Sequence, residues 1–273
     1  MIDGIKIFDA HTHYAGRFKK REETFIEFLD SYSIDKAIVT SINTTTTMDT
    51  IHKISEASKE TFTEEFDLNS QLDHTEVLKL VKTNPDRLTG FYWFNPKKPS
   101  EENWQTLEKY IRVYHFKGVK TQPCVNLLKI PEDLFLLAEF CIEYDIPLYI
   151  HSGIGFFFQK AFRARDIYKL AVKYPELKLI IGHMGYTMEY AINNLNYFTK
   201  RENVYFETSL SVPYAIVMII KAMGEHRVLY GSDAPTATTP DIEINKIRIL
   251  NLETKALENV FYNNISALLK MNK

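Results

Sequence analysis

The strongest constraint on the fold is a pattern that repeats along the whole chain. A short β-rich run is followed by a polar or glycine-containing turn and then by a stretch with helical spacing. Eight such runs occur, at residues 5–10, 36–42, 88–94, 116–120, 147–150, 177–181, 204–207 and 228–230. Each is rich in Ile, Val, Leu, Tyr and Phe, which is typical of strands buried on both faces of a parallel sheet. The pattern therefore predicts an α/β protein with eight parallel strands.

The segments between these runs carry apolar residues at helical spacing. In residues 131–144, for example, Leu134, Leu137 and Cys141 recur at intervals of three and four, which places them on one face of a helix. Pro131 precedes two acidic residues, and both features favour a helix start. We therefore expect strands and helices to alternate along the chain.

Alternating strands and helices admit an open doubly wound sheet or a closed barrel. No glycine-rich phosphate loop follows any of the runs, and the length of 273 residues suits a (β/α)8 barrel, which uses roughly 250. We predict one TIM-barrel domain over residues 1–273. Residues 43–73, with four threonines at 44–47, are long for a connection and are expected to form a loop insertion over the barrel mouth.

Composition and charge exclude several classes of protein. The net charge is −2 and no basic stripe is visible, which argues against nucleic acid as a partner. Two cysteines do not make a disulfide framework. The chain starts without a basic leader or apolar signal core, and its longest apolar run, residues 212–220, is far shorter than the ~20 residues of a membrane helix. We expect a cytoplasmic protein without membrane contact that acts on a small molecule; a homodimer stays open.

Polar side chains gather where the predicted strands end. The first run ends in Asp9-Ala10-His11-Thr12-His13, and the strand ends further along carry His151, His183 and Asp233. In a barrel these positions meet at one face, where active sites lie. Strand side chains alternate, so His11 and His13 point to the same side. Three imidazoles and a carboxylate suit a catalytic divalent metal with one open position.

Each of these residues also has a structural explanation when it is considered alone. His151 or His183 could be a hydrogen-bonded core histidine, and Asp233 could cap the following helix. A single His-x-His pair is a weak signal of metal binding. It is the combination of the four ligand candidates at strand ends that predicts a metal site.

The order and spacing of several motifs resemble the amidohydrolase superfamily. The motifs are DAHTH at 9–13, FKGVK at 116–120, YIHSG at 149–153, IIGHMG at 180–185, VYFETS at 204–209, YGSDAP at 230–235 and ENVFYNNISALL at 258–269. Within the superfamily, the chain is most similar to the amidohydrolase-related (amidohydrolase 2) group. That group includes aminocarboxymuconate semialdehyde decarboxylase and resorcylate decarboxylases.

The resemblance implies specific roles for the residues at the strand ends. His11, His13, His151 and Asp233 correspond to metal ligands, and His183 to a catalytic residue beside the metal. Asp233 would also take a proton from water. A zinc ion is the first expectation, while manganese, iron and nickel accept the same ligands.

The resemblance leaves more than one reaction open. The first expectation is hydrolysis of a small amide, ester or lactone by metal-activated water, because a bound divalent ion lowers the pKa of water from ~15.7 to about 7. The alternative is non-oxidative decarboxylation of a small aromatic or enoic acid. A second alternative is a catalytically silent barrel that only binds a ligand.

Lys120 ends the fourth predicted strand, and its role stays open. In superfamily members with two metals, a carboxylated lysine on this strand bridges the ions. Lys120 could form that bridge, bind a substrate anion, or point between strand and helix. We favour a single metal.

The remaining candidates concern the substrate. Arg17, Arg163 and Arg165 follow strand ends, and a guanidinium could hold a substrate carboxylate. Each could equally be a solvated surface arginine. Gly182 and Gly185 are expected to leave room for substrate beside His183, and Glu207 is given a supporting or structural role.

Overall fold

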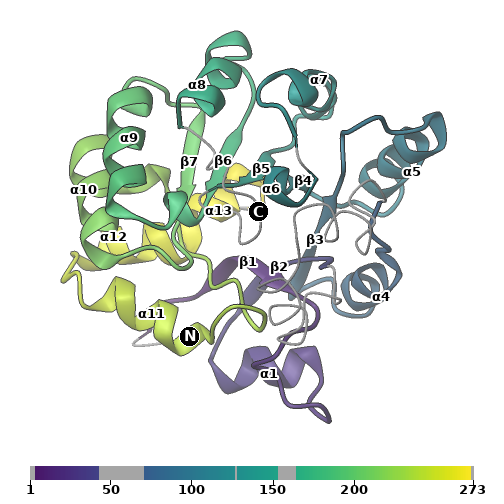
Figure 1. Ribbon diagram of the computed structural model, residues 1–273. Helices are drawn as coiled ribbons and strands as arrows, with labels where there is room; N and C mark the ends of the chain where they lie inside the picture. Colours follow the sequence, from purple (N-terminus) through teal and green to yellow (C-terminus); the bar gives the residue numbers. More distant parts are fainter. Residues whose placement is uncertain (1–3, 43–70, 127, 153–163, 272–273) are drawn as a thin grey trace, which may run out of the picture.

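One sheet of eight parallel strands forms the centre of the molecule, with the strands in sequence order (Figure 1). The computed structural model describes residues 4–42, 71–126, 128–152 and 164–271. The strands are β1 (Phe8–His13), β2 (Lys36–Thr40), β3 (Leu88–Trp93), β4 (Gly118–Thr121), β5 (Leu148–His151), β6 (Leu179–Gly182), β7 (Val204–Glu207) and β8 (Val228–Leu229). The predicted loop insertion at 43–73 lies almost entirely outside the described residues.

The last strand closes onto the first. The amide of Ala10 donates to the carbonyl of Tyr230 (2.9 Å), and the amide of His13 donates to the carbonyl of Ala234 (2.9 Å). In the reverse direction, the amide of Asp233 donates to the carbonyl of His11 (2.8 Å). The sheet is therefore a nearly closed barrel, and the predicted (β/α)8 fold is confirmed.

Helices surround the barrel, as Figure 1 shows. They are α1 (Phe25–Ser31), α4 (Thr75–Thr83), α5 (Glu101–Arg112), α6 (Pro123–Asn126), α7 (Phe135–Glu143), α8 (Ala164–Lys173), α9 (Met188–Phe198), α10 (Pro213–Met223), α11 (Pro240–Arg248), α12 (Thr254–Glu258) and α13 (Asn264–Leu268). Three short 3₁₀ helices, η1 (Glu132–Leu134), η2 (His183–Gly185) and η3 (Glu225–Arg227), and a π-helix, η4 (Asn259–Asn263), complete the elements. Within the described ranges, every helix is too short or too polar to span a lipid bilayer.

Local sequence explains where several helices begin. Helix α1 starts with a capping box in which the Thr24 hydroxyl accepts from the amide of Glu27 and the Glu27 carboxylate accepts from the amide of Thr24. Such a box satisfies amides that have no partner within the helix. In α7, the predicted residues Leu137 and Cys141 are buried against the sheet. The helical spacing read from the sequence thus marks the face that packs on the barrel.

The apolar core has two layers. The larger layer lies between strands and helices, as in other α/β barrels. The smaller layer lies inside the barrel and consists of Phe8, Ala10, Ile38, Phe91, Tyr149, Ile180 and Leu229 from the strands together with Ile265, Leu268 and Leu269 from α13 and its end. Because α13 packs against β1 and β8, it covers the amino-terminal end of the barrel. Polar residues inside the barrel are left at the carboxyl-terminal end.

Strand β1 changes phase along its length. Phe8 and Ala10 both belong to the inner apolar layer, yet His11 and His13 also lie inside, with ring centroids 5.2 Å apart. The pairing of β1 with β2 shifts register between Asp9 and Thr12, which is the signature of a bulge. This shift turns both imidazoles inward above the apolar layer.

Candidate active site

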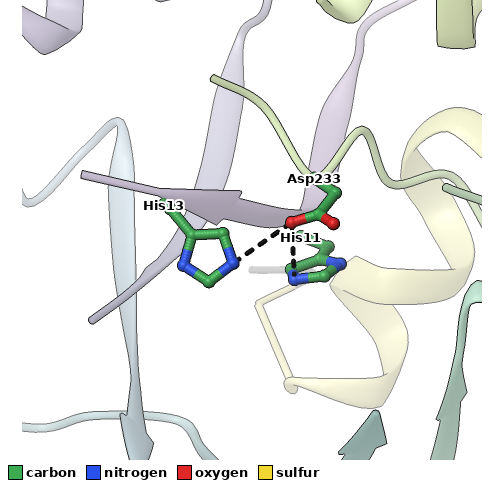
Figure 2. A group of neighbouring side chains, drawn as sticks. All are labelled: His11, His13 and Asp233. Atoms are coloured by element: carbon green, nitrogen blue, oxygen red, sulfur yellow. Dashed lines mark ion pairs between the residues drawn. The ribbon is translucent and has the colours of Figure 1, made fainter. Parts of the chain in front are cut away.

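Three electron-pair donors converge at the carboxyl end of the barrel. Figure 2 shows the imidazoles of His11 and His13 both directed at one oxygen of the Asp233 carboxylate. The Oδ1 atom of Asp233 lies 3.4 Å from Nε2 of His11 and 3.1 Å from Nε2 of His13. All three side chains are buried. The structure therefore brings together three of the four predicted ligands, and His151 is not part of this group.

Hydrogen bonds on the far side of each ring indicate which nitrogen carries the proton. Nδ1 of His13 lies 3.1 Å from the carbonyl of Ser41, which can only accept, so this nitrogen donates. Nδ1 of His11 lies 2.8 Å from the hydroxyl of Tyr149. Because that hydroxyl donates to Glu207 at 2.6 Å, its oxygen accepts from His11. Both Nε2 atoms therefore present lone pairs to Asp233.

Burial sets the charges of this group. Desolvation, and then the positive charge of Lys120, lower the pKa values of His11 and His13 below their usual range. Burial opposes the ionisation of Asp233, but the pKa of this carboxyl is nevertheless held well below its usual value. Neutral imidazoles and an ionised carboxylate are the protonation states that metal binding requires.

This arrangement fits a divalent cation. Two imidazole lone pairs and a carboxylate oxygen face one another in a buried space, which is unfavourable unless a positive charge lies between them. Nitrogen and oxygen donors of this kind bind zinc and manganese. His11, His13 and Asp233 would hold the cation, and their outer hydrogen bonds would keep the rings oriented for it.

His151 and His183 form a second pair beside this group. Nδ1 of His183 lies 2.8 Å from the hydroxyl of Ser209, which donates to Glu207 at 2.9 Å. Nδ1 of His183 is therefore the donor, and its Nε2 accepts from Nδ1 of His151 at 3.0 Å. Nε2 of His151 is left as the acceptor, 3.4 Å from the hydroxyl of Tyr186. His151 thus contacts His183 first, and its remaining lone pair, on Nε2, faces the hydroxyl of Tyr186.

Glu207 is the common acceptor of both histidine chains. One chain reaches it from His11 through Tyr149, and the other from His183 through Ser209. Burial opposes its ionisation, but the hydrogen bonds and charges around it, led by His11, lower the pKa of Glu207 to about 2. A buried, permanently ionised Glu207 therefore fixes the proton positions of two histidines.

A second group of donors, His11, His183 and Glu207, also lies within metal-ligating range. In this group the oxygens of Glu207 already accept from Tyr149, from Ser209 and from the amide of His183. The Nδ1 atom of His11 carries a proton for the reasons given above. The Glu207 oxygens and Nδ1 of His11 are already engaged in internal hydrogen bonds and are not available as metal ligands. This favours a single cation at Asp233.

The backbone at two site residues is unusual. His183 has a φ of 59° and Asp233 a φ of 56°, in the left-handed region that residues other than glycine rarely adopt. Such conformations cluster at functional sites because the surrounding structure must hold them. At Asp233 the amide is held by the carbonyl of His11.

Asp9 supports the bulge in β1. Its Oδ1 accepts from the amides of His11 and Ser232, each at 3.0 Å, and so ties β1 to the segment that leads into Asp233. Burial raises the pKa of Asp9 to about 8. This aspartate stands in the DAHTH motif, but it belongs to neither group of possible metal ligands among the described residues.

Lys120 lies inside the same cluster. It is buried, and its Nζ lies 2.5 Å from Nε2 of His11 and 3.2 Å from Nε2 of His13. Gly118, two residues earlier, abuts the inner-layer ring of Phe91, which confirms that this face of β4 points into the barrel. The expectation that Lys120 could point between strand and helix is therefore wrong.

The two arginine candidates within the described residues are not brought to this cluster. Arg17 and Arg165 are exposed at the surface, and Nε of Arg165 lies 3.9 Å from Oδ1 of Asp166. Arg163 lies outside the described residues. The assignment of these arginines to a substrate carboxylate stays a prediction.

The two glycines beside His183 have a different role from the expected one. A Cβ atom on Gly182 would lie 2.3 Å from the hydroxyl of Tyr149, and one on Gly185 would lie 2.3 Å from Cβ of Tyr190. Both positions therefore leave room for tyrosines of this chain. The expectation that they leave room for substrate is corrected.

Sequence reasoning missed several polar residues of the site. Tyr149 stands two residues before His151 on β5, so strand alternation could have placed it inside the barrel. Ser209 and Tyr186 lie in loops, and their contacts depend on the fold around them. Glu207 was given only a supporting role, whereas the structure makes it the acceptor on which both histidine chains end.

An α/β barrel with imidazole and carboxylate donors at the carboxyl ends of its strands defines the class of metal-dependent (β/α)8 enzymes. The model of the amidohydrolase family matches residues 51–271. The chain belongs to this family, as the sequence motifs suggested. The matched segment contains His151, His183 and Asp233, while His11 and His13 precede it. No curated protein matches the chain.

Several solved structures share the fold at low sequence identity. The 2,6-dihydroxybenzoate decarboxylase from Rhizobium is 14% identical, with a TM-score of 0.70 over 98% of this chain and 100% of that one. The manganese-containing 5-carboxyvanillate decarboxylase from Novosphingobium aromaticivorans is 17% identical (TM-score 0.67; 98% and 96% covered). A probable 2-pyrone-4,6-dicarboxylic acid hydrolase from Acinetobacter baumannii is 13% identical (TM-score 0.65; 97% and 100% covered).

Proposed function

We propose that this protein is a metal-dependent, non-oxidative decarboxylase of a small aromatic acid. The observation that carries the proposal is the buried convergence of two imidazole lone pairs and the Asp233 carboxylate. Aromatic rings lie beside the cluster: the centroids of Trp93 and Tyr149 are 5.5 and 5.2 Å from Nζ of Lys120, which itself contacts His11 and His13. A planar aromatic acid could pack against such rings while its acidic group faces the cation.

The similar structures support decarboxylation over hydrolysis. Decarboxylases of hydroxylated or methoxylated benzoic acids recur among them, and two of these proteins were solved with manganese and an aromatic ligand. The hydrolase expected first from the sequence is therefore the second candidate here.

The reaction replaces a carboxylate on a ring carbon by a proton and releases CO2. A divalent cation would supply positive charge that binds and polarises the acidic group of the substrate. We propose a single ion; zinc and manganese are both compatible with the donors. His11 and His13 hold the ligand geometry through Tyr149 and Ser41.

Two side chains are proposed to handle the proton. Asp233 has its ionised carboxylate at the cluster, so it can take a proton from water and pass it to the ring carbon that loses CO2. His183 is linked through Ser209 to Glu207. The negative charge of Glu207 can therefore stabilise, through these hydrogen bonds, a proton that His183 gains. Burial lowers the pKa of His183 to about 4, which keeps the imidazole neutral near pH 7. It can accept a proton at Nε2 once the hydrogen bond from Nδ1 of His151 is broken.

A lactone or amide hydrolase remains the second candidate, because one of the similar structures is a probable pyrone dicarboxylic acid hydrolase. The same donors could activate water for that reaction. The two candidates differ in their products: only the decarboxylase releases CO2.

The test uses purified protein loaded with Mn²⁺ or Zn²⁺ and a panel of hydroxybenzoic acids beside a panel of lactones and amides. We expect CO2 release and the matching phenol, both lost in Asp233→Asn. Hydrolysis of a lactone without CO2 release would favour the second candidate. A metal-loaded protein that acts on neither panel would overturn both.

A further inference from the structure

The cation that faces the metal ligands in this structure belongs to the chain itself. Nζ of Lys120 lies 2.5 Å from Nε2 of His11 and 3.2 Å from Nε2 of His13. These are the same lone pairs that converge with Asp233. The aromatic faces of Trp93 and Tyr149 flank the amine, with centroids 5.5 and 5.2 Å from Nζ.

Lys120 in this position and a bound metal are mutually exclusive. A metal bonded to imidazole lies about 2.0–2.1 Å from the nitrogen, along its single lone pair. An amine hydrogen-bonded to that lone pair occupies the same direction. Lys120 must therefore leave both Nε2 atoms before the histidines can bind a metal.

Once its hydrogen bonds to His11 and His13 are broken, the side chain of Lys120 remains confined near the site. The residue is on the inner face of β4, it is buried, and Trp93 and Tyr149 stand on either side. Cation–π attraction to these rings keeps a positive charge close to the site. The charge balance then favours an anion: a divalent cation and Lys120 give three positive charges, against one negative charge on Asp233 and one on Glu207.

We propose that Lys120 is an internal counter-cation that fills the metal position in the metal-free protein and, once displaced, binds the acidic group of the substrate. The second half of this proposal rests on the proposed decarboxylase function. It names the substrate class: aromatic acids that are held between the metal and a lysine, in preference to neutral phenols. The first half is independent of any reaction.

The first experiment measures metal affinity by competition with a chromophoric chelator, starting from metal-free protein. Lys120→Met should bind Mn²⁺ more tightly than the wild type, on the order of tenfold, because no internal hydrogen bond must be broken. The matched control Lys117→Met, on an exposed lysine three residues away, should equal the wild type. Lys120→Gln provides a second variant if the methionine protein does not fold.

The second experiment measures ligand binding to the metal-loaded proteins. Lys120→Met should bind 2,6-dihydroxybenzoate about 10- to 100-fold more weakly, as expected for loss of a charge-assisted hydrogen bond. Its affinity for neutral resorcinol should stay unchanged. Equal losses for both ligands, or no loss for the acid, would contradict the substrate half of the proposal.

The two proposals fail in distinguishable ways. Unchanged or weaker metal binding by Lys120→Met overturns the counter-cation, and so does an intact mass that reveals a CO2 adduct on Lys120; decarboxylation by the wild type could still stand. Conversely, tighter metal binding by the variant supports the counter-cation even if the wild type releases no CO2 from any acid.

Discussion

The two ends of the barrel interior differ, although the same strands build both. Near the amino ends the inward side chains are apolar, as at Phe8 and Phe91, and α13 covers them. Near the carboxyl ends the inward side chains are His11, His13 and Lys120, and all are buried. On one strand, an apolar side chain that stabilises the fold and a buried polar side chain lie only one or two residues apart. Burial of the polar side chain is tolerated only when hydrogen bonds or opposite charges compensate for its lost hydration.

This difference indicates how stability and function are divided. The apolar layer excludes water without needing any specific partner. The polar layer is held by hydrogen bonds that end on Glu207 and on the carbonyl of Ser41, and its three facing lone pairs need a cation. We therefore expect substitutions in the polar layer to change metal binding and activity, and substitutions in the apolar layer to change the free energy of unfolding.

The largest effect is expected at the centre of the polar layer. Asp233→Asn removes the negative charge between His11 and His13, and we expect kcat/KM to fall on the order of 10⁴-fold with a melting temperature close to that of the wild type. Asp241→Asn, at an exposed position of α11, is the matched control. Full activity of Asp233→Asn would show that the Asp233 carboxylate has no role in the reaction.

The converse is expected in the apolar layer. Phe91→Ala leaves a cavity beside Gly118 and should destabilise the protein by about 3–5 kcal/mol. The folded fraction should still bind the metal with wild-type affinity, because no ligand contacts this ring. Urea titration with and without metal measures both quantities. Loss of metal affinity in a folded variant would show that the two layers are not separable.

A buried histidine outside the barrel sharpens the comparison. His74 donates from Nδ1 to the carbonyl of Leu72 (2.8 Å), and its Nε2 accepts from the amide of Trp93 (2.8 Å). Burial lowers the pKa of His74 to about 4. Between pH 6.5 and 4 the unfolded chain binds a proton that the folded one does not, so stability should fall as pH falls through this window, by on the order of 3 kcal/mol.

The measurement compares the free energy of unfolding from pH 7 to pH 4 in the wild type and in His74→Gln. The variant should lose that part of the pH dependence, while the exposed control His226→Gln should keep it. Identical pH profiles for His74→Gln and the wild type would refute the assignment. Activity per folded molecule should be unaffected by His74→Gln.

The smallest effect is expected at the edge of the polar layer. Glu207→Gln keeps the shape but removes the charge that both histidine chains reach, so metal affinity should fall about 10- to 100-fold. Glu202→Gln, on an exposed glutamate, is the control. An unchanged metal affinity together with unchanged ¹⁵N shifts of the His11 ring would show that Glu207 does not fix its proton.

The repeating pattern predicted the barrel because parallel strands and amphipathic helices leave strong periodic signals. Strand β7 has the predicted bounds, whereas β1 starts at Phe8 and continues to His13. The bulge that turns His11 inward was not predictable, since it depends on Asp9 binding the amide of Ser232, 223 residues away.

In the candidate site, too, contacts between residues far apart in the sequence could not be predicted. Alternation put His11 and His13 on one side of the strand, and the strand ends placed them near Asp233, but the inward direction of that side depends on the bulge. The contact of His151 with His183 and the place of Lys120 among the imidazoles depend on distances across the barrel, which no single strand encodes. Tyr149 could have been found from its spacing to His151.

The most direct test of the account is the number of metal ions that one chain binds. Equilibrium dialysis of the wild type against Mn²⁺, followed by elemental analysis, should give one ion per chain, and the same procedure on His13→Ala should give none at equal folding. Two ions in the wild type, or one ion retained by His13→Ala, would contradict a single cation held by the lone pairs that face Asp233.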